Sequence, residues 1–399
     1  MKSDREPFLQ EITQLWWDLP TQAPDFGQSY SLSQQIANGR MLEKLQDDIL
    51  TALKESGPKE PASPSVQEKI TQFLLTMVIT STEIQAEHIQ AVRDAHILEN
   101  SVKFSEQARR FDPSLTESDI YQASRNIWTF NILQCFFNLP VSLTPAMFAY
   151  SLLYPYTDNY LDNPHVSLHT KMSFNERFRN RLEGKNSPAE NSQEKRIYEL
   201  IEIIEHQIDR AQNPAIYQSL MSILNAQRDS VSLMKKDASP YELDILGLSF
   251  TKGAASVIAD GYLISSELTN EQRRLLIHFG AFTQLWDDLE DLQEDQRAGQ
   301  RTIFTQTAPR WPLDAITNRT FHFGQALMDR IKTFQHPGNV KLIECFQIGF
   351  TPFFIYSSGK MSRYFSTKYR LNLQNHFPYR FSLIERVRKR LLHAGIRII

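Results

Sequence analysis

Two short acidic stretches are the parts of this sequence whose residue types and spacing could do chemistry. The first acidic stretch is Asp158–Asp162 (DNYLD), and the second is Asp287–Asp291 (DDLED), followed by Asp295. In a helix, residues four apart lie on one face, so each stretch brings carboxylates together. The repulsion between these carboxylates is relieved when cations lie among them. Because Mg²⁺ prefers oxygen ligands of this kind, the spacing predicts metal binding.

The alternative is a solvated helix end, which is the commoner case for an acidic run that occurs alone. Here, however, both stretches follow long apolar approaches. The approach to the second stretch contains apolar or small residues, among them Phe279, Gly280, Phe282, Thr283 and Leu285. We therefore expect two helices, each buried at one end and acidic at the other, at the mouth of a cavity that holds metal ions.

The composition is that of an ordinary globular protein. Of the 399 residues, 41% are hydrophobic and 22% are charged, and the formal net charge is −3. A pI near 6.4 gives no general basic field, so nucleic acid is not an expected partner. The two cysteines, Cys135 and Cys345, show neither disulfide nor metal-binding spacing, and the first residues do not resemble a signal peptide. These features predict a cytoplasmic protein.

No charged residue occurs between Arg125 and Asp158, a stretch long enough to cross a bilayer. Polar residues and prolines divide it into apolar pieces that are each too short, at Asn131, Gln134, Asn138, Pro140 and Pro145. The mean hydropathy of the chain is −0.40. We therefore predict two helices buried inside the protein and joined near residues 140–145, rather than a membrane span.

Helical periodicity dominates the chain, and strand patterns bounded by turn residues are nearly absent. Residues 1–65 are predicted to form an N-terminal helical arm and a linker. Residues 66–399 are predicted to form one all-α domain, a bundle or barrel of about ten helices. Thr116 and Asp119 have the spacing of a helix capping box. Further helices are expected near residues 66–92, 193–211, 214–235, 241–267 and 271–296.

Three blocks of the sequence resemble the trans-isoprenyl diphosphate synthase group of the class I isoprenoid synthases. The second acidic stretch, in the context FGAFTQLWDDLED, resembles the second DDxxD motif of that group. Upstream, Ala226–Asp229 (AQRD) resembles the GQxxDL helix, and residues 241–252 (YELDILGLSFTK) resemble the segment that ends in Lys-Thr. The blocks have the family's order and spacing, within a match over roughly residues 125–305. The resemblance implies an all-α class I isoprenoid synthase barrel with an N-terminal helical extension.

The departures from the family pattern bear on the activity. Asn159 replaces the second aspartate of the first motif, Lys252-Gly253 replaces Lys-Thr, and Gly299-Gln300-Arg301 replaces a basic Gly-Lys. The Gly-Lys-Arg-x-Arg-Pro segment that binds isopentenyl diphosphate is not found. Loss of this second-substrate segment resembles terpene synthases, which act on one prenyl diphosphate. Arg363-Tyr364 is similar to the diphosphate-sensing pair of many terpene cyclases, and the DNxLD form is similar to the bacterial large-terpene synthases.

The resemblance implies a Mg²⁺-dependent class I terpene synthase that ionises a linear prenyl diphosphate, releases pyrophosphate, and cyclises the resulting cation or eliminates a proton from it. The expected ligands of three Mg²⁺ ions are Asp158, Asn159, Asp162, Asp287, Asp288 and Asp291, and the five aspartates are also the expected catalytic residues. The expected substrate-binding residues are Lys252, Arg301, Arg363, Tyr364, Gln227, Asp229, Tyr154 and Thr283.

Tyr154 and Thr283 belong to this set because each lies one helical turn before an acidic stretch. A dry cavity at that level would protect a carbocation from water, and aromatic faces would stabilise its charge. The alternative is that these residues belong to an ordinary core, and Pro155 would in any case kink the first helix. No base for the final deprotonation is assigned, because released pyrophosphate could accept the proton.

Two other functions stay open at the level of the sequence: a prenyltransferase that condenses two isoprenoid diphosphates, and a non-catalytic isoprenoid synthase-like subunit. A homodimer is common in the family. The tail after Thr367 contains many basic residues against one acid, Glu385. The tail predicts either peripheral contact with an anionic membrane, where a lipophilic substrate would reside, or a solvated basic helix. Its basic residues are Lys368, Arg370, Arg380, Arg386, Arg388, Lys389, Arg390 and Arg397.

Overall fold

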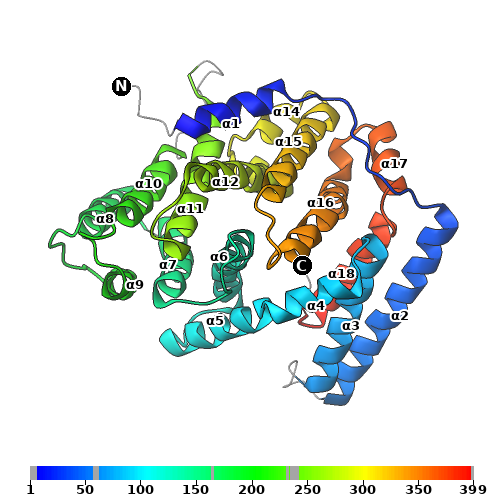
Figure 1. The fold of residues 1–399 in the computed structure, drawn as a ribbon, viewed down its shortest axis with the longest axis horizontal. Helices are drawn as coiled ribbons and strands as arrows, with labels where there is room; N and C mark the ends of the chain where they lie inside the picture. The colour runs from blue at the N-terminus through cyan, green and yellow to red at the C-terminus, as the bar shows by residue number, and fades with distance from the viewer. Residues whose placement is uncertain (1–6, 57–62, 163–165, 231–232, 234–241, 397–399) are drawn as a thin grey trace. The chain divides into compact units, whose positions relative to one another are not determined.

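The structure, a computed structural model, describes residues 7–56, 63–162, 166–230, 233 and 242–396 (Figure 1). All regular structure in these ranges is helical, which confirms the predicted all-α class. Over the same ranges, no helix is both long and apolar enough to cross a membrane. Contacts between Cα atoms divide the chain into two compact units. Unit 1 contains Met1–Asp18, Gln90–Leu285 and Ala326–Ile343, and unit 2 contains Leu19–Ile89, Trp286–Gln325 and Glu344–Ile399.

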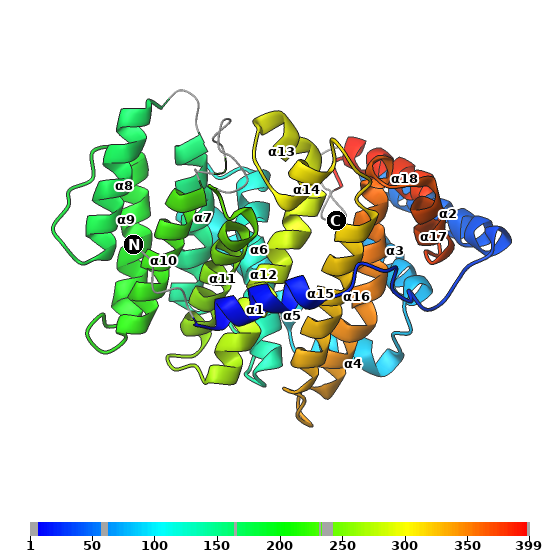
Figure 2. The same cartoon turned by 90° about the horizontal axis from the view of Figure 1, so that it is seen from above.

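Unit 1 contains eight helices that lie wholly within its bounds: α1 (Pro7–Asp18), α5 (Ile97–Phe111), α6 (Glu117–Phe136), α7 (Pro145–Asp162), α8 (Leu168–Leu182), α9 (Ser192–Gln207), α10 (Pro214–Ser230) and α11 (Ile245–Ile264). Helix α7 packs against α6 and α9, and α11 packs against α10, α6 and α7. Figure 2 shows α8, α9 and α10 running side by side. These helices enclose one hydrophobic cluster, to which α6 and α7 contribute Ile127, Phe130, Leu152 and Leu153.

The uncharged stretch forms the two helices that were predicted, α6 and α7, with residues 137–144 between them. Thr116 and Asp119 make the predicted capping box at the start of α6. Two buried amides of the stretch, those of Asn131 and Gln134, are hydrogen-bonded inside unit 1. The Asn131 Oδ1 accepts a hydrogen bond from Asn100 Nδ2 at 2.6 Å, and the Gln134 Oε1 accepts one from the backbone N–H of Ser142 at 3.0 Å. These two polar side chains therefore interrupt the apolar sequence, and their amide groups have hydrogen-bond partners inside the protein.

Unit 2 wholly contains α2 (Leu32–Ser56), α3 (Pro64–Ser81), α13 (Leu292–Ala298), α14 (Ile303–Thr307), the 3₁₀ turn η2 (Ser362–Tyr364), α17 (Thr367–Asn375) and α18 (Phe381–His393). The N-terminal helix α2 lies beside α3 and the C-terminal α18 (Figure 1). Side-chain amides join the two ends of the chain, because Gln35 Nε2 donates to the Phe377 carbonyl at 3.0 Å and Gln46 Nε2 donates to the Val387 carbonyl at 2.7 Å. Such buried amides fix how α2 lies against the tail.

The division between the units falls inside four helices: α4 (Ala86–Asp94), α12 (Asn270–Glu290), α15 (Asp314–Lys332) and α16 (Val340–Lys360). Residues 1–65, predicted as an arm and linker, are shared between the two units, with residues 1–18 in unit 1 and the following ones in unit 2. The particular barrel of the isoprenoid synthases stays a prediction.

Several predicted helix boundaries are wrong. The helix expected at 66–92 is two helices, since α3 ends at Ser81 with Thr82 in an extended conformation and α4 begins at Ala86. The helix expected at 271–296 is interrupted at Asp291 (φ −89°, ψ 5°), which separates α12 from α13. The helix expected at 241–267 begins only at Ile245, where the Asp244 side chain caps it by accepting from the Gly247 N–H at 2.9 Å. In the described ranges the helices exceed the ten or so predicted.

Candidate functional site

The second acidic stretch lies at the junction of α12 and α13. Asp287 and Asp288 belong to the last turn of α12, and Asp291 is the residue between the two helices. Asp288 is only 2% exposed, whereas Asp287 and Asp291 are half-buried. A carboxylate buried to this degree needs compensating partners. The carboxylate oxygens present here are the donor type that a hard cation such as Mg²⁺ takes.

Because the helix breaks at Asp291, Asp295 lies on the separate short helix α13. The sequence predicted one continuous helix face formed by Asp287, Asp291 and Asp295, and that prediction is wrong. The break limits the continuous helical part of the stretch to the residues up to Glu290.

Glu290 points into a hydrogen-bond network of unit 2 that the sequence did not reveal. Its Oε1 accepts from the Lys360 Nζ at 2.6 Å and from the Ser357 Oγ at 2.6 Å. The Trp286 Nε1 in turn donates to the Ser357 Oγ at 3.0 Å. Burial alone would raise the pKa of Glu290, but Lys360 and these hydrogen bonds hold it below its usual value. Glu290 therefore anchors the end of α12 to α16.

The Arg363-Tyr364 pair lies in η2, and the structure brings it to α13. The Tyr364 hydroxyl donates to the Gln296 Oε1 at 2.8 Å and lies 2.5 Å from the Arg363 Nη2. The Arg363 guanidinium also covers the Tyr364 ring at 4.6 Å from its centroid. Arg301 is half-buried in the segment after Gly299, whose positive φ of 75° ends α13. Arg363 and Tyr364 thus lie within side-chain reach of the helix that follows the second acidic stretch.

The first acidic stretch lies at the C-terminal end of α7. The helix continues through Asp162 and contains Pro155. The side chains of Asp158, Asn159 and Asp162 lie outside the described part of the structure, so their role as metal ligands stays a prediction. Tyr154, one turn earlier, is half-buried. Among the described side chains, no three of histidine, cysteine, aspartate or glutamate converge closely enough to hold a metal ion.

Lys252 lies in α11, which crosses α12 at very short range. A Cβ on Gly253 would lie 2.1 Å from the Gly280 carbonyl oxygen, and a Cβ on Gly280 would lie 2.3 Å from the Gly253 carbonyl oxygen. Neither position can hold a side chain at this separation. The glycine in place of the family's threonine is therefore explained by helix packing. Lys252 itself is half-buried, and among the described residues it has no ion pair within 4 Å.

Thr283 and Asp229, two of the remaining predicted substrate-binding residues, have ordinary structural contacts. The Thr283 Oγ1 donates to the Phe279 carbonyl at 3.0 Å, within its own helix. Asp229, on α10, is exposed, and its Oδ1 accepts from the neighbouring Arg228 at 3.2 Å. Gln227 is half-buried on the same helix. Exposed ion pairs such as the one at Asp229 contribute little to stability.

A polar group inside unit 1 was missed at the sequence level. The Tyr150 hydroxyl, on α7, lies 3.4 Å from the Ser256 Oγ on α11. One turn further along α11, Asp260 is 1% exposed, and its Oδ1 has no hydrogen-bond partner in the described structure. Burial raises the pKa of Asp260 well above its usual value. The available signal was a single acid in the otherwise uncharged segment after Lys252.

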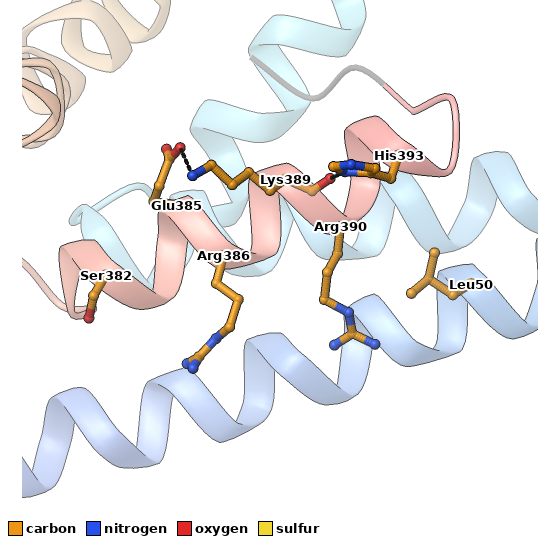
Figure 3. A pocket seen from close by; sticks show the side chains of 7 residues that line it. All are labelled: Leu50, Ser382, Glu385, Arg386, Lys389, Arg390 and His393. Atoms are coloured by element: carbon orange, nitrogen blue, oxygen red, sulfur yellow. Dashed lines mark hydrogen bonds and ion pairs between the residues drawn. The ribbon is translucent and has the colours of Figure 1, made fainter.

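The basic tail forms α17 and α18, with Arg397 outside the described residues. Four cations of α18 pair with acids of unit 2: Arg386, Arg388, Lys389 and Arg390. Arg386 lies 3.3 Å from Glu43 and Arg390 lies 3.0 Å from Asp47, both acids on α2. Figure 3 shows Arg386 and Arg390 directed toward α2, and Lys389 directed toward Glu385. The groove between the helices has a volume of about 460 Å³. This pairing favours the solvated basic helix over membrane contact, which stays a prediction.

A search against protein-family models finds no match, and no curated protein matches the sequence significantly.

Proposed function

We propose that this protein is a Mg²⁺-dependent class I terpene synthase that ionises a linear prenyl diphosphate and releases pyrophosphate. The observation that carries the proposal is the arrangement around the second acidic stretch. Asp287, Asp288 and Asp291 lie at the end of a buried helix, with Asp288 only 2% exposed. An acidic surface helix would leave all three exposed, whereas a metal-binding stretch requires some burial and a rigid support.

Two further contacts support the same reading. The Glu290–Lys360 ion pair holds the end of α12 against α16, so the aspartates project from an anchored segment. The Tyr364–Gln296 hydrogen bond places a guanidinium and a phenol beside α13. Neither contact would be expected from the acidic stretch alone. In the proposed reaction, Arg363 binds the diphosphate through its planar guanidinium, which suits bidentate contact with phosphate oxygens.

In the proposed mechanism, Asp287 and Asp288 of α12 and Asp291, which follows it, would hold Mg²⁺, and Asp158, Asn159 and Asp162 of α7 would hold it as well. The bound ions supply electrophilic stabilisation of the negative charge that develops on the leaving pyrophosphate. Lys252, half-buried and without an ion pair among the described residues, is available to bind a diphosphate oxygen. Apolar residues of the unit 1 cluster exclude water from the hydrocarbon chain.

The direct test measures pyrophosphate release from prenyl diphosphates of increasing chain length, with Mg²⁺ and with EDTA. We expect release with one chain length, dependent on Mg²⁺, and reduced about a hundredfold or more in Asp287→Ala because metal stabilisation of the leaving group is lost. Glu294→Ala removes an exposed acid on the neighbouring α13 and is the matched control. Pyrophosphate release that is equally fast in the presence of EDTA would contradict the proposal.

Two outcomes of the same assay identify the other functions. Consumption of added isopentenyl diphosphate, with elongation of the prenyl chain, would assign the protein as a prenyltransferase. No release from folded protein at any chain length would assign it as a non-catalytic subunit. The cyclase or elimination activity predicts pyrophosphate and a hydrocarbon product from one prenyl diphosphate alone.

A further inference from the structure

Asp260 is a buried acid that the proposed ionisation step does not use. Lys252 and Asp260 are the only charged residues of α11. Asp260 is 1% exposed, and its Oδ1 has no hydrogen-bond partner in the described structure. A buried polar atom without a partner lowers the stability of the folded protein. A carboxyl group that lowers stability in an otherwise apolar helix, such as that of Asp260, suggests a bound ligand that contacts it.

The surroundings of Asp260 are apolar, with one other polar pair nearby. The adjacent Ala259 is fully buried in the hydrophobic cluster of unit 1. Tyr150, from α7, also belongs to this cluster and meets the Phe130 ring edge-on at 5.9 Å. Burial raises the pKa of Tyr150, and the charge of Asp260 would raise it further, so the two groups are electrostatic neighbours. The Tyr150 hydroxyl reaches the Ser256 Oγ at 3.4 Å.

Tyr150 and Asp260 lie far enough along their helices to face the hydrocarbon part of a prenyl chain rather than its diphosphate. Tyr150 precedes Asp158 by two turns of α7, and Asp260 follows Lys252 by two turns of α11. Each separation is eight residues, which corresponds to about 12 Å of helix. The contact between Tyr150 and Ser256 joins these levels of the two helices. A prenyl chain whose diphosphate meets Lys252 would extend its hydrocarbon part to the level of Asp260 along α11.

The protonation state follows from burial. Asp260 is 1% exposed and has no ion pair among the described residues, so burial raises the pKa of its carboxyl group and favours the neutral form over the carboxylate. A neutral carboxyl has a carbonyl oxygen that accepts a proton and a hydroxyl that donates one. It can therefore pass a proton between two carbons without any net change in its own charge.

We infer that Asp260 is a proton-transfer residue that acts on the carbocation after ionisation, an inference that rests on the proposed function. The carbonyl oxygen of Asp260 takes a proton from the carbon next to the cationic centre, and the electrons of that C–H bond form a C=C bond. The Asp260 hydroxyl then gives its own proton to another alkene carbon of the same chain, which recreates the cation at a new position. The carboxyl ends neutral, and released pyrophosphate still accepts the last proton.

The test is product labelling in D₂O, because the hydroxyl proton of Asp260 exchanges with solvent before the reaction. The full chain is incubated with Mg²⁺ and the prenyl diphosphate from which it releases pyrophosphate. We expect the hydrocarbon product to carry one carbon-bound deuterium. In Asp260→Leu, we expect pyrophosphate release within about tenfold of the unchanged protein. The product of this variant should contain no deuterium and should have its double bonds in different positions.

Ser151→Ala is the matched control, because the Ser151 Oγ is also buried without a partner among the described residues, and it lies on α7. This variant should keep the deuterium label. An unlabelled product from the unchanged protein, or a label retained in Asp260→Leu, would overturn the inference while leaving the ionisation intact. Absence of pyrophosphate release from every form of the protein would instead overturn the proposed function, and the inference with it.

Discussion

Two carboxyl groups of this protein, the half-buried Glu290 and the fully buried Asp260, have opposite surroundings. At the end of α12, Glu290 accepts from Lys360 and Ser357, both at 2.6 Å, and its pKa is lowered despite burial. One turn before the C-terminal end of α11, Asp260 has no hydrogen-bond partner at its Oδ1 among the described residues, and burial raises its pKa. The two groups share chemistry and differ in their partners. Burial alone therefore does not decide whether an acid is ionised.

The difference also separates two uses of a buried acid. A carboxylate held by a lysine and a hydroxyl fixes the position of a helix end, here next to Asp287 and Asp288. A buried carboxyl group without a partner lowers the stability of the fold. We therefore expect mutation of the Glu290–Lys360 pair to lower the free energy of unfolding, and mutation of Asp260 to raise it.

The largest expected effect comes from Lys360→Met, which leaves Glu290 half-buried without its cation. We expect a loss of about 2–3 kcal/mol in the free energy of unfolding, because an uncompensated buried charge is costly. Chemical denaturation would measure it. Lys389→Met removes the exposed partner of Glu385, 3.5 Å away, and should cost less than about 0.5 kcal/mol. Equal losses in the two variants would contradict the anchoring role of Glu290.

Asp260→Leu should have the opposite sign. Replacing an unpartnered buried carboxyl by an apolar side chain of similar size should stabilise the protein by about 1–2 kcal/mol at pH 7. Thermal unfolding of the variant beside the unchanged protein would show this as a rise in Tm. A fall in Tm would show that Asp260 contributes to the fold and would remove the contrast with Glu290.

The pH dependence sharpens the contrast, because the two pKa values move in opposite directions. Glu290 stabilises the fold above its unfolded value near 4.5, and this contribution is lost as the pH falls through its lowered folded pKa. Asp260 has a folded pKa above its unfolded value near 3.8, so ionisation of the unfolded chain destabilises the fold as the pH rises from there. The gain in Asp260→Leu should therefore grow with pH, by at most about 1.4 kcal/mol per pH unit.

Denaturation at a series of pH values from about 4 to 7 would test both groups together. The loss in Lys360→Met and the gain in Asp260→Leu should both shrink toward the acidic end. A gain in Asp260→Leu that stays constant with pH would show that the folded carboxyl titrates as it does in the unfolded chain.

The sequence was sufficient for features that local patterns determine. The all-α class, the two uncharged helices and the capping box at Thr116 were predicted correctly, because periodicity and cap residues act within a few residues. The break at Asp291 was not predicted. The anchor of the preceding turn is Lys360, far along the chain, and no local pattern reveals that contact.

Two site features were misread for the same reason. At the sequence level, Gly253 was interpreted as the loss of the family's threonine. The structure shows that a side chain at this position would collide with the Gly280 carbonyl oxygen of α12. Asp260 was passed over because periodicity gives no information on whether a buried acid has a partner. The position of Tyr364 against Gln296 likewise depends on tertiary folding of unit 2. Residue types therefore indicate which chemistry is possible, whereas contacts between distant parts of the chain determine which of these side chains lie close together.

The smallest stability effect is expected at Tyr364, which lies in η2 and contacts Gln296 of α13. Tyr364→Phe removes the hydrogen bond to Gln296 but keeps the ring, so the free energy of unfolding should change by less than about 0.5 kcal/mol. Pyrophosphate release should nevertheless slow down, since Arg363 loses the hydroxyl that orients it. Gln296→Leu should reproduce the effect, and Tyr121→Phe, at an exposed tyrosine of α6, should not. Unchanged release in both Tyr364→Phe and Gln296→Leu would remove the Arg363-Tyr364 pair from the proposed site, while leaving Glu290 as the anchor of the aspartates.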